Sequence, residues 1–122
     1  MRTLASCALL IAAVIHLLPL AGMLGTARLS ALYGIVVEDP NLEILLRHRA
    51  VLFGLLGAFL GYAAFQPSLQ PLAFIAGTAS VVSFLWLARS VAGHNAALER
   101  VARVDLVGLA CLVFGFVAFV RT

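Results

Sequence analysis

The chain has 122 residues, of which 64% are hydrophobic and 11% are charged, and its mean hydropathy is +1.14. An average soluble domain is about 45–50% apolar and about 25% charged. A soluble chain of this length has too little interior to bury so much apolar surface, and the same composition excludes intrinsic disorder. We therefore expect most of the chain to lie in lipid.

The net charge of +3 comes from eight arginines, without any lysine, and five acidic residues. These charges are scattered, and the sequence has no basic run of the kind that binds nucleic acid. Cys7 and Cys111 lie in apolar runs without a further cysteine or a histidine at metal-binding spacing. We therefore expect membrane lipid as the surroundings, no nucleic-acid partner, no metal and no other cofactor.

Four apolar runs are long enough, or nearly long enough, to cross a bilayer. A spanning helix needs about 20 apolar residues, within a range of about 17–25. Runs that do not alternate polar and apolar residues are helices rather than barrel strands. Asp39 and Pro40 predict the start of the second helix, because they suit the N-cap and the first helical position. The expected helices cover residues 4–24, 40–65, 72–88 and 100–120.

These runs predict an all-α four-helix transmembrane bundle that forms a single domain over residues 1–122. The first run is long enough to span, so we expect it to be retained rather than cleaved as a signal peptide. The apolar stretch 31–37 is too short to span and is expected either at the interface or folded back over the bundle. Four spans place both termini on the same side. Six of the eight arginines flank the first and third connectors, which favours a cytoplasmic location for these connectors.

Small residues at helical spacing predict where the helices approach closely, because membrane helices associate through such seams. They are Gly54, Gly57 and Gly61 in the second helix, Gly77 in the third, and Gly108, Cys111 and Gly115 in the fourth. Two interpretations stay open, a seam within one chain and a face between two copies of the chain.

Four ionisable residues are candidates for ligand binding, because such groups are costly inside a membrane and usually face a partner. They are His16, Arg47, Arg49 and Asp105. Pro19, one turn after His16, removes a backbone donor, and a kink there would open space beside the imidazole. The alternative for His16 is a position near the membrane edge, where it bonds to a backbone carbonyl or to water.

Arg47 and Arg49 point about 200° apart on a helix, so only one of them can face the bundle. That arginine would clamp an anionic group or form a buried pair with Asp105. The alternative is that both reach phospholipid head groups. Glu43 has the spacing to pair with Arg47, and Asp105 would also suit the positive end of the last helix.

Common catalytic motifs are absent from the sequence. It contains no G-x-S-x-G motif, no Walker loop and no dinucleotide-binding fingerprint. We assign no catalytic residue.

Several segments resemble those of small bacterial four-helix membrane proteins that are DoxX-like in architecture. They are residues 16–19 (HLLP), 32–34 (LYG), 39–42 (DPNL) and 46–54 (LRHRAVLFG). The resemblance covers nearly the whole chain and implies a bundle in the bacterial inner membrane, without an assigned reaction. Some sequences that look like this are labelled phosphopantetheine adenylyltransferase. Of that soluble enzyme's motif, T/S-x-G-x-F-D-P-x-H-x-G-H, only Asp39 and Pro40 occur here, so we do not expect that activity.

Three functions are consistent with the sequence. The first is an accessory or structural membrane subunit, as a homo-oligomer or with a membrane-protein partner. The second is a binder or carrier of a small lipophilic or anionic ligand, such as a quinone or a lipid head group, at the four candidate residues. The third is a membrane-embedded redox or transferase enzyme. Convergence of the four candidates on a cavity would favour the second and third functions, whereas side chains that point to lipid head groups would remove the basis for both.

Overall fold

The computed structural model describes residues 2–121, in which helices alternate with short connections and no strand occurs. The helices are α1 (Arg2–Leu17), η1 (Leu18–Leu24), α2 (Thr26–Tyr33), α3 (Pro40–Ala63), η2 (Pro67–Leu69), α4 (Gln70–Ser90) and α5 (Ala96–Val120), where η marks a 3-10 helix. Four stretches are long and apolar enough to cross a membrane, namely Thr3–Leu24, Pro40–Ala63, Pro67–Ser90 and Ala96–Val120. The expected all-α four-helix transmembrane bundle is confirmed, and the chain is an integral membrane protein.

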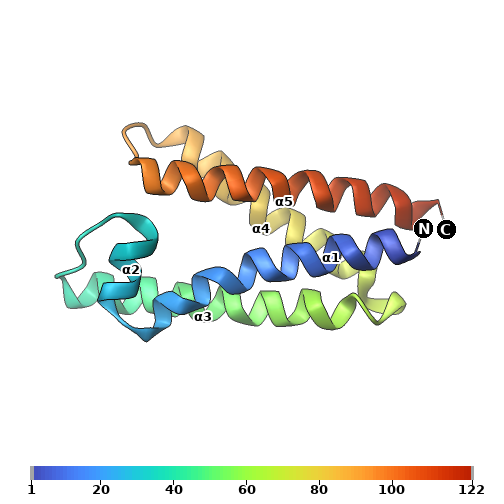
Figure 1. Cartoon of the computed structure of the whole chain (residues 1–122), viewed down its shortest axis with the longest axis horizontal. Helices are drawn as coiled ribbons and strands as arrows, with labels where there is room; N and C mark the ends of the chain where they lie inside the picture. The colour runs from blue at the N-terminus through green and yellow to red at the C-terminus, as the bar shows by residue number, and fades with distance from the viewer. Residues whose placement is uncertain (1, 122) are drawn as a thin grey trace.

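The long helices lie side by side (Figure 1). α1 packs against α3 and α5, and α4 packs mainly against α5. α1 begins and α5 ends at one end of the bundle, whereas α3 and α5 begin, and α4 ends, at the other end beside α2 (Figure 1). We call this second end the α2 end.

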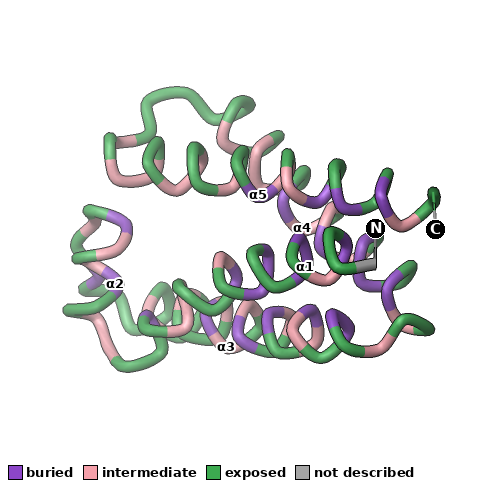
Figure 2. Tube along the Cα trace, turned by 45° about the vertical axis from the view of Figure 1, so that its right-hand side comes forward, coloured by how far each residue is buried: buried purple, intermediate pink, exposed green. Residues whose placement is uncertain are grey.

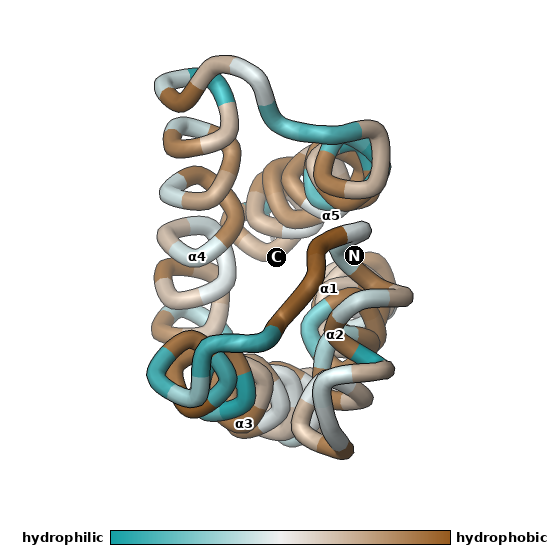
Figure 3. The backbone as a smooth tube through the Cα atoms, turned by 90° about the vertical axis from the view of Figure 1, so that its left-hand side faces the viewer, coloured by the Kyte–Doolittle hydropathy of each residue, from teal (hydrophilic) through white to brown (hydrophobic). Residues whose placement is uncertain are grey.

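The outer surface of the bundle is apolar, which is the reverse of a water-soluble protein. Leu55, Ile75 and Phe114 expose 63%, 66% and 69% of their surface, and buried positions line the contacts between helices (Figure 2). Hydrophilic positions gather at the α2 end, at the start of α3 and between α4 and α5 (Figure 3). Removing apolar surface from water gains a free energy of about 25 cal/mol per Å². An apolar outer surface is therefore stable in the hydrocarbon of a bilayer and costly to expose to water.

Side-chain caps fix the starts of two long helices at the α2 end. The Asp39 side chain accepts a hydrogen bond from the Asn41 backbone N–H at 2.9 Å, and the Asn95 side chain accepts one from the Leu98 N–H at 2.9 Å. The Asn95 cap starts α5 at Ala96, earlier than the expected residue 100. α3 ends at residue 63 rather than 65, and α4 covers 70–90 rather than 72–88.

The first span changes its helix type near its end. α1 ends at Leu17, and the chain continues as a 3-10 helix through Pro19 to Leu24, because proline cannot donate the hydrogen bond that an α-helix needs. The chain then forms α2, which is capped after Tyr33 by Gly34 in the left-handed conformation with φ 66°. α2 contacts η1, α3 and α5, so the first connector folds back over the bundle, which was one of the two expected positions.

Small residues make the closest contacts between the helices. A Cβ atom on Gly57 would lie 3.1 Å from the Ala13 carbonyl oxygen, and one on Gly115 would lie 2.3 Å from Ala8 Cβ. The other glycines expected at seams also face neighbouring helices of the same chain; they are Gly54, Gly61, Gly77 and Gly108. These glycine faces are therefore occupied within one chain.

Candidate functional site

Every long helix, together with α2, contributes one polar side chain to a cluster inside the bundle. The members are His16 of α1, Tyr33 of α2, Arg49 of α3, Ser80 of α4 and Asp105 of α5, and we call them the inner polar cluster. Arg49 and Asp105 each lie nine residues beyond the first residue of their helix, which corresponds to about 14 Å from the α2 end. Apart from Tyr33, its members therefore lie within the membrane-spanning stretches, where ionisable groups usually have partners.

His16 connects α1 to α4. Its side chain is buried, with Nδ1 2.8 Å from the Ala12 carbonyl oxygen and Nε2 2.9 Å from Ser80 Oγ. Because the carbonyl can only accept, Nδ1 donates to it, and Nε2 shares the second hydrogen bond with the Ser80 hydroxyl. The Phe53 ring of α3 lies 5.7 Å from the imidazole, centroid to centroid. Both ring nitrogens of His16 therefore have hydrogen-bond partners within the chain.

Arg49 lies among three aromatic rings. Its guanidinium carbon is 4.5 Å from the ring centroid of Phe53, 5.4 Å from that of Tyr33 and 5.8 Å from that of Phe84, within the cation–π range of about 6 Å. Arg49 Nη1 donates a hydrogen bond to the Tyr33 hydroxyl, the only hydrogen bond of this guanidinium to the described part of the chain. A guanidinium has five N–H donors, so most of its donors remain free for a ligand or water.

Asp105 approaches the same region from α5. It is half-buried, and the positive charge of Arg49 acts on its carboxylate. Within residues 2–121 the carboxylate forms no direct ion pair, so the buried pair with an arginine is electrostatic at a distance rather than a contact. The expected place at the start of the last helix is wrong, because α5 already begins at Ala96.

Arg47 lies outside the inner polar cluster. It is exposed, its Nη1 donates to Glu43 Oε2 at 3.0 Å, and its Nε donates to the Met23 carbonyl oxygen at 2.9 Å. The Glu43–Arg47 pair expected from the spacing is therefore confirmed. Of the two arginines, Arg49 faces the interior and Arg47 the surface. Three of the four candidate residues thus come together, and Arg47 does not join them.

Four residues of this region were not predicted to bind a ligand, namely Tyr33, Phe53, Ser80 and Phe84. Ser80 is one of several small residues in an apolar run, and Tyr33 lies in a connector whose structure was undecided. A usable signal exists for Phe53, which follows Arg49 by four residues and therefore shares its helix face. Ser80 has no such signal, because its partner His16 is 64 residues away in the sequence.

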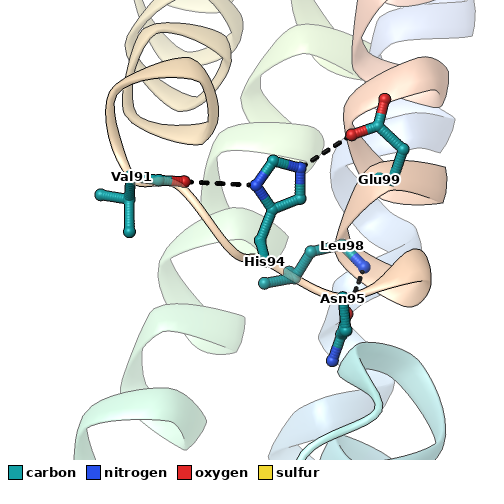
Figure 4. Close-up of polar contacts among 5 residues, drawn as sticks. All are labelled: Val91, His94, Asn95, Leu98 and Glu99. Atoms are coloured by element: carbon teal, nitrogen blue, oxygen red, sulfur yellow. Dashed lines mark hydrogen bonds and ion pairs between the residues drawn. The ribbon is translucent and has the colours of Figure 1, made fainter.

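A second polar arrangement joins the loop after α4 to the first turn of α5 (Figure 4). His94 Nε2 is 2.7 Å from Glu99 Oε2, and His94 Nδ1 is 3.3 Å from the Val91 carbonyl oxygen. Because both partners are acceptors, the two ring nitrogens can donate both hydrogen bonds at once only when the ring is protonated. The hydrogen bond to the Glu99 carboxylate, followed by the bond to the Val91 carbonyl, raises the pKa of His94 above its usual 6.5.

Asn95 connects this loop to α2. Besides capping α5 through its oxygen, its side-chain nitrogen donates to the carbonyl oxygens of Tyr33 at 2.8 Å and Gly34 at 3.1 Å. Tyr33 is therefore held at its carbonyl by Asn95 and at its hydroxyl by Arg49. Tyr33 therefore connects the loop between α4 and α5 to the inner polar cluster.

Groups of three or more His, Cys, Asp or Glu side chains that could hold a metal ion do not occur in the described part of the chain. Comparison of the chain with protein-family models, with curated proteins and with solved structures finds no match. The geometry of the inner polar cluster combines a cation among aromatic rings, a carboxylate and a histidine–serine pair. Such a set can hydrogen-bond a polar head group and pack against a flat ring.

Proposed function

We propose that the protein binds a small lipophilic molecule with a neutral polar head, of the quinone or quinol class, at the inner polar cluster. The observation that carries this proposal is the position of Arg49, which lies among aromatic rings within a membrane-spanning stretch and keeps unused donors within electrostatic reach of Asp105. A quinone carbonyl would accept a hydrogen bond from Arg49. A quinol hydroxyl would donate one to Asp105, and Phe53 and Phe84 would pack against the ring.

The charges of the cluster favour a neutral head group over an anionic one. Arg49 is positive and Asp105 supplies a negative charge, and both ring nitrogens of His16 already have hydrogen-bond partners within the chain. An anion attracted by Arg49 would also approach the Asp105 carboxylate, and like charges repel strongly where water is scarce. A carbonyl or hydroxyl group satisfies both partners without this repulsion.

A purely structural role accounts less well for these residues. Helix seams built from small residues need no ionisable groups, and an arginine or aspartate at a helix centre costs about 2.5–3.5 kcal/mol. Arg49 and Asp105 are both kept in the interior but do not contact each other. This arrangement is typical of a site that is completed by a ligand.

Equilibrium binding of a short-chain ubiquinone and its quinol to the purified protein in nanodiscs tests the proposal. We expect binding to the wild type and at least about tenfold weaker binding to Arg49→Gln, because a hydrogen bond to a charged group is worth about 1.5–3 kcal/mol. Arg47→Gln is the matched control, since it removes the same charge two residues away and leaves the cluster intact. Asp105→Asn should weaken quinol binding more than quinone binding.

Two outcomes would contradict the proposal. One is a wild-type protein that binds neither form of the quinone. The other is an equal loss of affinity in Arg49→Gln and Arg47→Gln, which would point to surface charge rather than to the cluster. Native mass spectrometry of the same nanodisc samples would report any small molecule that co-purifies with the chain.

A further inference from the structure

A cleft of about 330 Å³ lies between the end of α4 and the start of α5, apart from the inner polar cluster. Its charged lining residues are Arg89, His94, Glu99 and Arg103. Its apolar lining includes Leu85 and Leu106, which lie one turn further into the spans. Charged and apolar walls therefore meet in this cleft at the α2 end.

The cleft carries a net positive charge. Arg89 and Arg103 come from different helices, and both of their charges act on the Glu99 carboxylate. His94 donates a hydrogen bond to the same carboxylate (Figure 4). Glu99 is the single acidic residue among the lining residues. Because these residues flank the last turn of α4 and the first turns of α5, the excess positive charge lies at the level of lipid head groups.

A second groove, of about 480 Å³, lies further along the same two helices. Its lining residues include Ile75, Thr78, Ala79 and Val82 of α4 and Val113 and Phe116 of α5. Steps of seven residues lead from Ile75 through Val82 to Arg89, so the groove and the cleft share one face of α4. Ile75 and Arg89 are about 21 Å apart along the helix axis, which exceeds half of a hydrocarbon core of about 30 Å.

We propose that the basic cleft and the apolar groove together bind one anionic phospholipid along the outside of the α4–α5 contact. The phosphate lies between Arg89 and Arg103, and one acyl chain follows the groove toward Ile75. Guanidinium groups pair their N–H donors with phosphate oxygens. Basic pockets between transmembrane helices are typical sites for anionic lipid heads.

The charge distribution selects a lipid over a second copy of the chain. Copies inserted in one membrane share their orientation, so a neighbour would bring its own basic α2 end against the cleft, and the like charges would repel. A phospholipid carries a negative head and an apolar chain in the same order as the cleft and the groove. The lipid site is also separate from the inner polar cluster, so the two proposals can fail independently.

Native mass spectrometry of the full chain, released from nanodiscs of phosphatidylcholine and phosphatidylglycerol, tests the lipid site. We expect one phosphatidylglycerol retained per chain in preference to phosphatidylcholine. The double variant Arg89→Gln with Arg103→Gln should lower this preference by roughly tenfold or more, because each arginine near the membrane surface favours anionic lipid. Arg28→Gln with Arg47→Gln is the control, since it removes the same charge from exposed positions at the same end.

Two further measurements distinguish the contribution of the head-group contacts to lipid binding from that of the groove. Ala79→Phe fills the groove and should shorten lipid retention, whereas Ala58→Phe, at an exposed position on α3, should not. Excess inorganic phosphate should not displace the lipid, because the acyl chain also holds it. The proposal is overturned if the two arginine pairs behave alike, if inorganic phosphate alone displaces the lipid, or if Ala79→Phe changes the dimer content and not the lipid content.

Discussion

Arg47 and Arg49 are separated by one residue and have opposite surroundings. Arg49 lies among Phe53, Tyr33 and Phe84 inside the bundle, whereas Arg47 pairs with Glu43 on the surface. The two side chains leave the helix about 200° apart, so the same chemical group becomes a candidate binding group in one case and a surface ion pair in the other. The helix face, and not the residue type, decides the role.

His94 should titrate differently when its acidic partner is removed. Its pKa is raised above 6.5, mainly by Glu99, so the pair stabilises the fold fully below about pH 6.5 and loses this effect as the pH rises through the raised pKa. Arg89 and Arg103 are the other charged groups that act on Glu99. A titration of the His94 ring by NMR should give a lower pKa in Glu99→Gln than in the wild type.

Thermal unfolding at two pH values provides the matching stability measurement. The wild type should be more stable than Glu99→Gln at about pH 6, and this difference should shrink at about pH 9. Glu43→Gln removes a surface carboxylate elsewhere and should leave the His94 titration unchanged. An identical His94 titration in Glu99→Gln and the wild type would contradict the contact.

Among the helices, α1 has the central place in the packing. It contacts both α3 and α5, and its alanines at positions 5, 8, 12 and 13 are buried. Gly57 of α3 and Gly115 of α5 approach this face from two sides. Because lipid provides no hydrophobic force between helices, these close backbone contacts set how tightly the bundle packs.

The tightest of these contacts should respond most strongly to one added methyl group. A Cβ atom in Gly115→Ala would lie 2.3 Å from Ala8 Cβ, so α1 and α5 would have to separate, at a cost of about 1–3 kcal/mol in the free energy of unfolding. In Gly61→Ala the nearest atom is 3.7 Å away, so stability should stay within about 1 kcal/mol of the wild type. Denaturant titration of helicity in mixed micelles measures both variants, and equal losses would contradict the described packing.

The four spans were predictable because a helix in lipid needs only a long apolar run, a property local to each segment. α2 was not predicted as a helix, because Thr26–Tyr33 is short and is stabilised by contacts with η1, α3 and α5. The 3-10 form of residues 18–24 was also missed, although Pro19 indicated an interruption. Both features depend on neighbours that are distant in the sequence.

The sequence predicted that ionisable residues form the candidate site, but it predicted only some of the residues that come together there. His16, Arg49 and Asp105 stood out because ionisable groups are rare in apolar runs. The choice of Arg49 over Arg47 depends on how α3 is rotated about its axis, which is fixed where Gly54 and Gly57 pack against the first span. No local pattern in the sequence encodes that rotation, and the same holds for the partnership of Ser80 with His16.

For the bundle as a whole, charge is concentrated at one end. Six of the eight arginines lie in the half that contains α2. Arginine-rich connectors usually stay in the cytoplasm, so we propose that the α2 end faces the cytoplasm and that the turn between α3 and α4 faces outward.

Cysteine labelling in bacterial cells tests this orientation. In a chain carrying Cys7→Ala and Cys111→Ala, Ser68→Cys places a thiol in η2 and Ser90→Cys places one at the end of α4, and both positions are exposed. A membrane-impermeant maleimide should label Ser68→Cys in intact cells and should label Ser90→Cys only after permeabilisation. The reverse pattern would assign the opposite orientation.

Tyr33 accepts a hydrogen bond from Asn95 at its backbone carbonyl and another from Arg49 at its side-chain hydroxyl. Lifting α2 away from the bundle must therefore release the surface loop and the interior guanidinium in the same movement. Two hydrogen bonds to the same residue, Tyr33, hold the short helix against the bundle. Any opening of the interior at this end would therefore also break the contacts of Asn95 with α2.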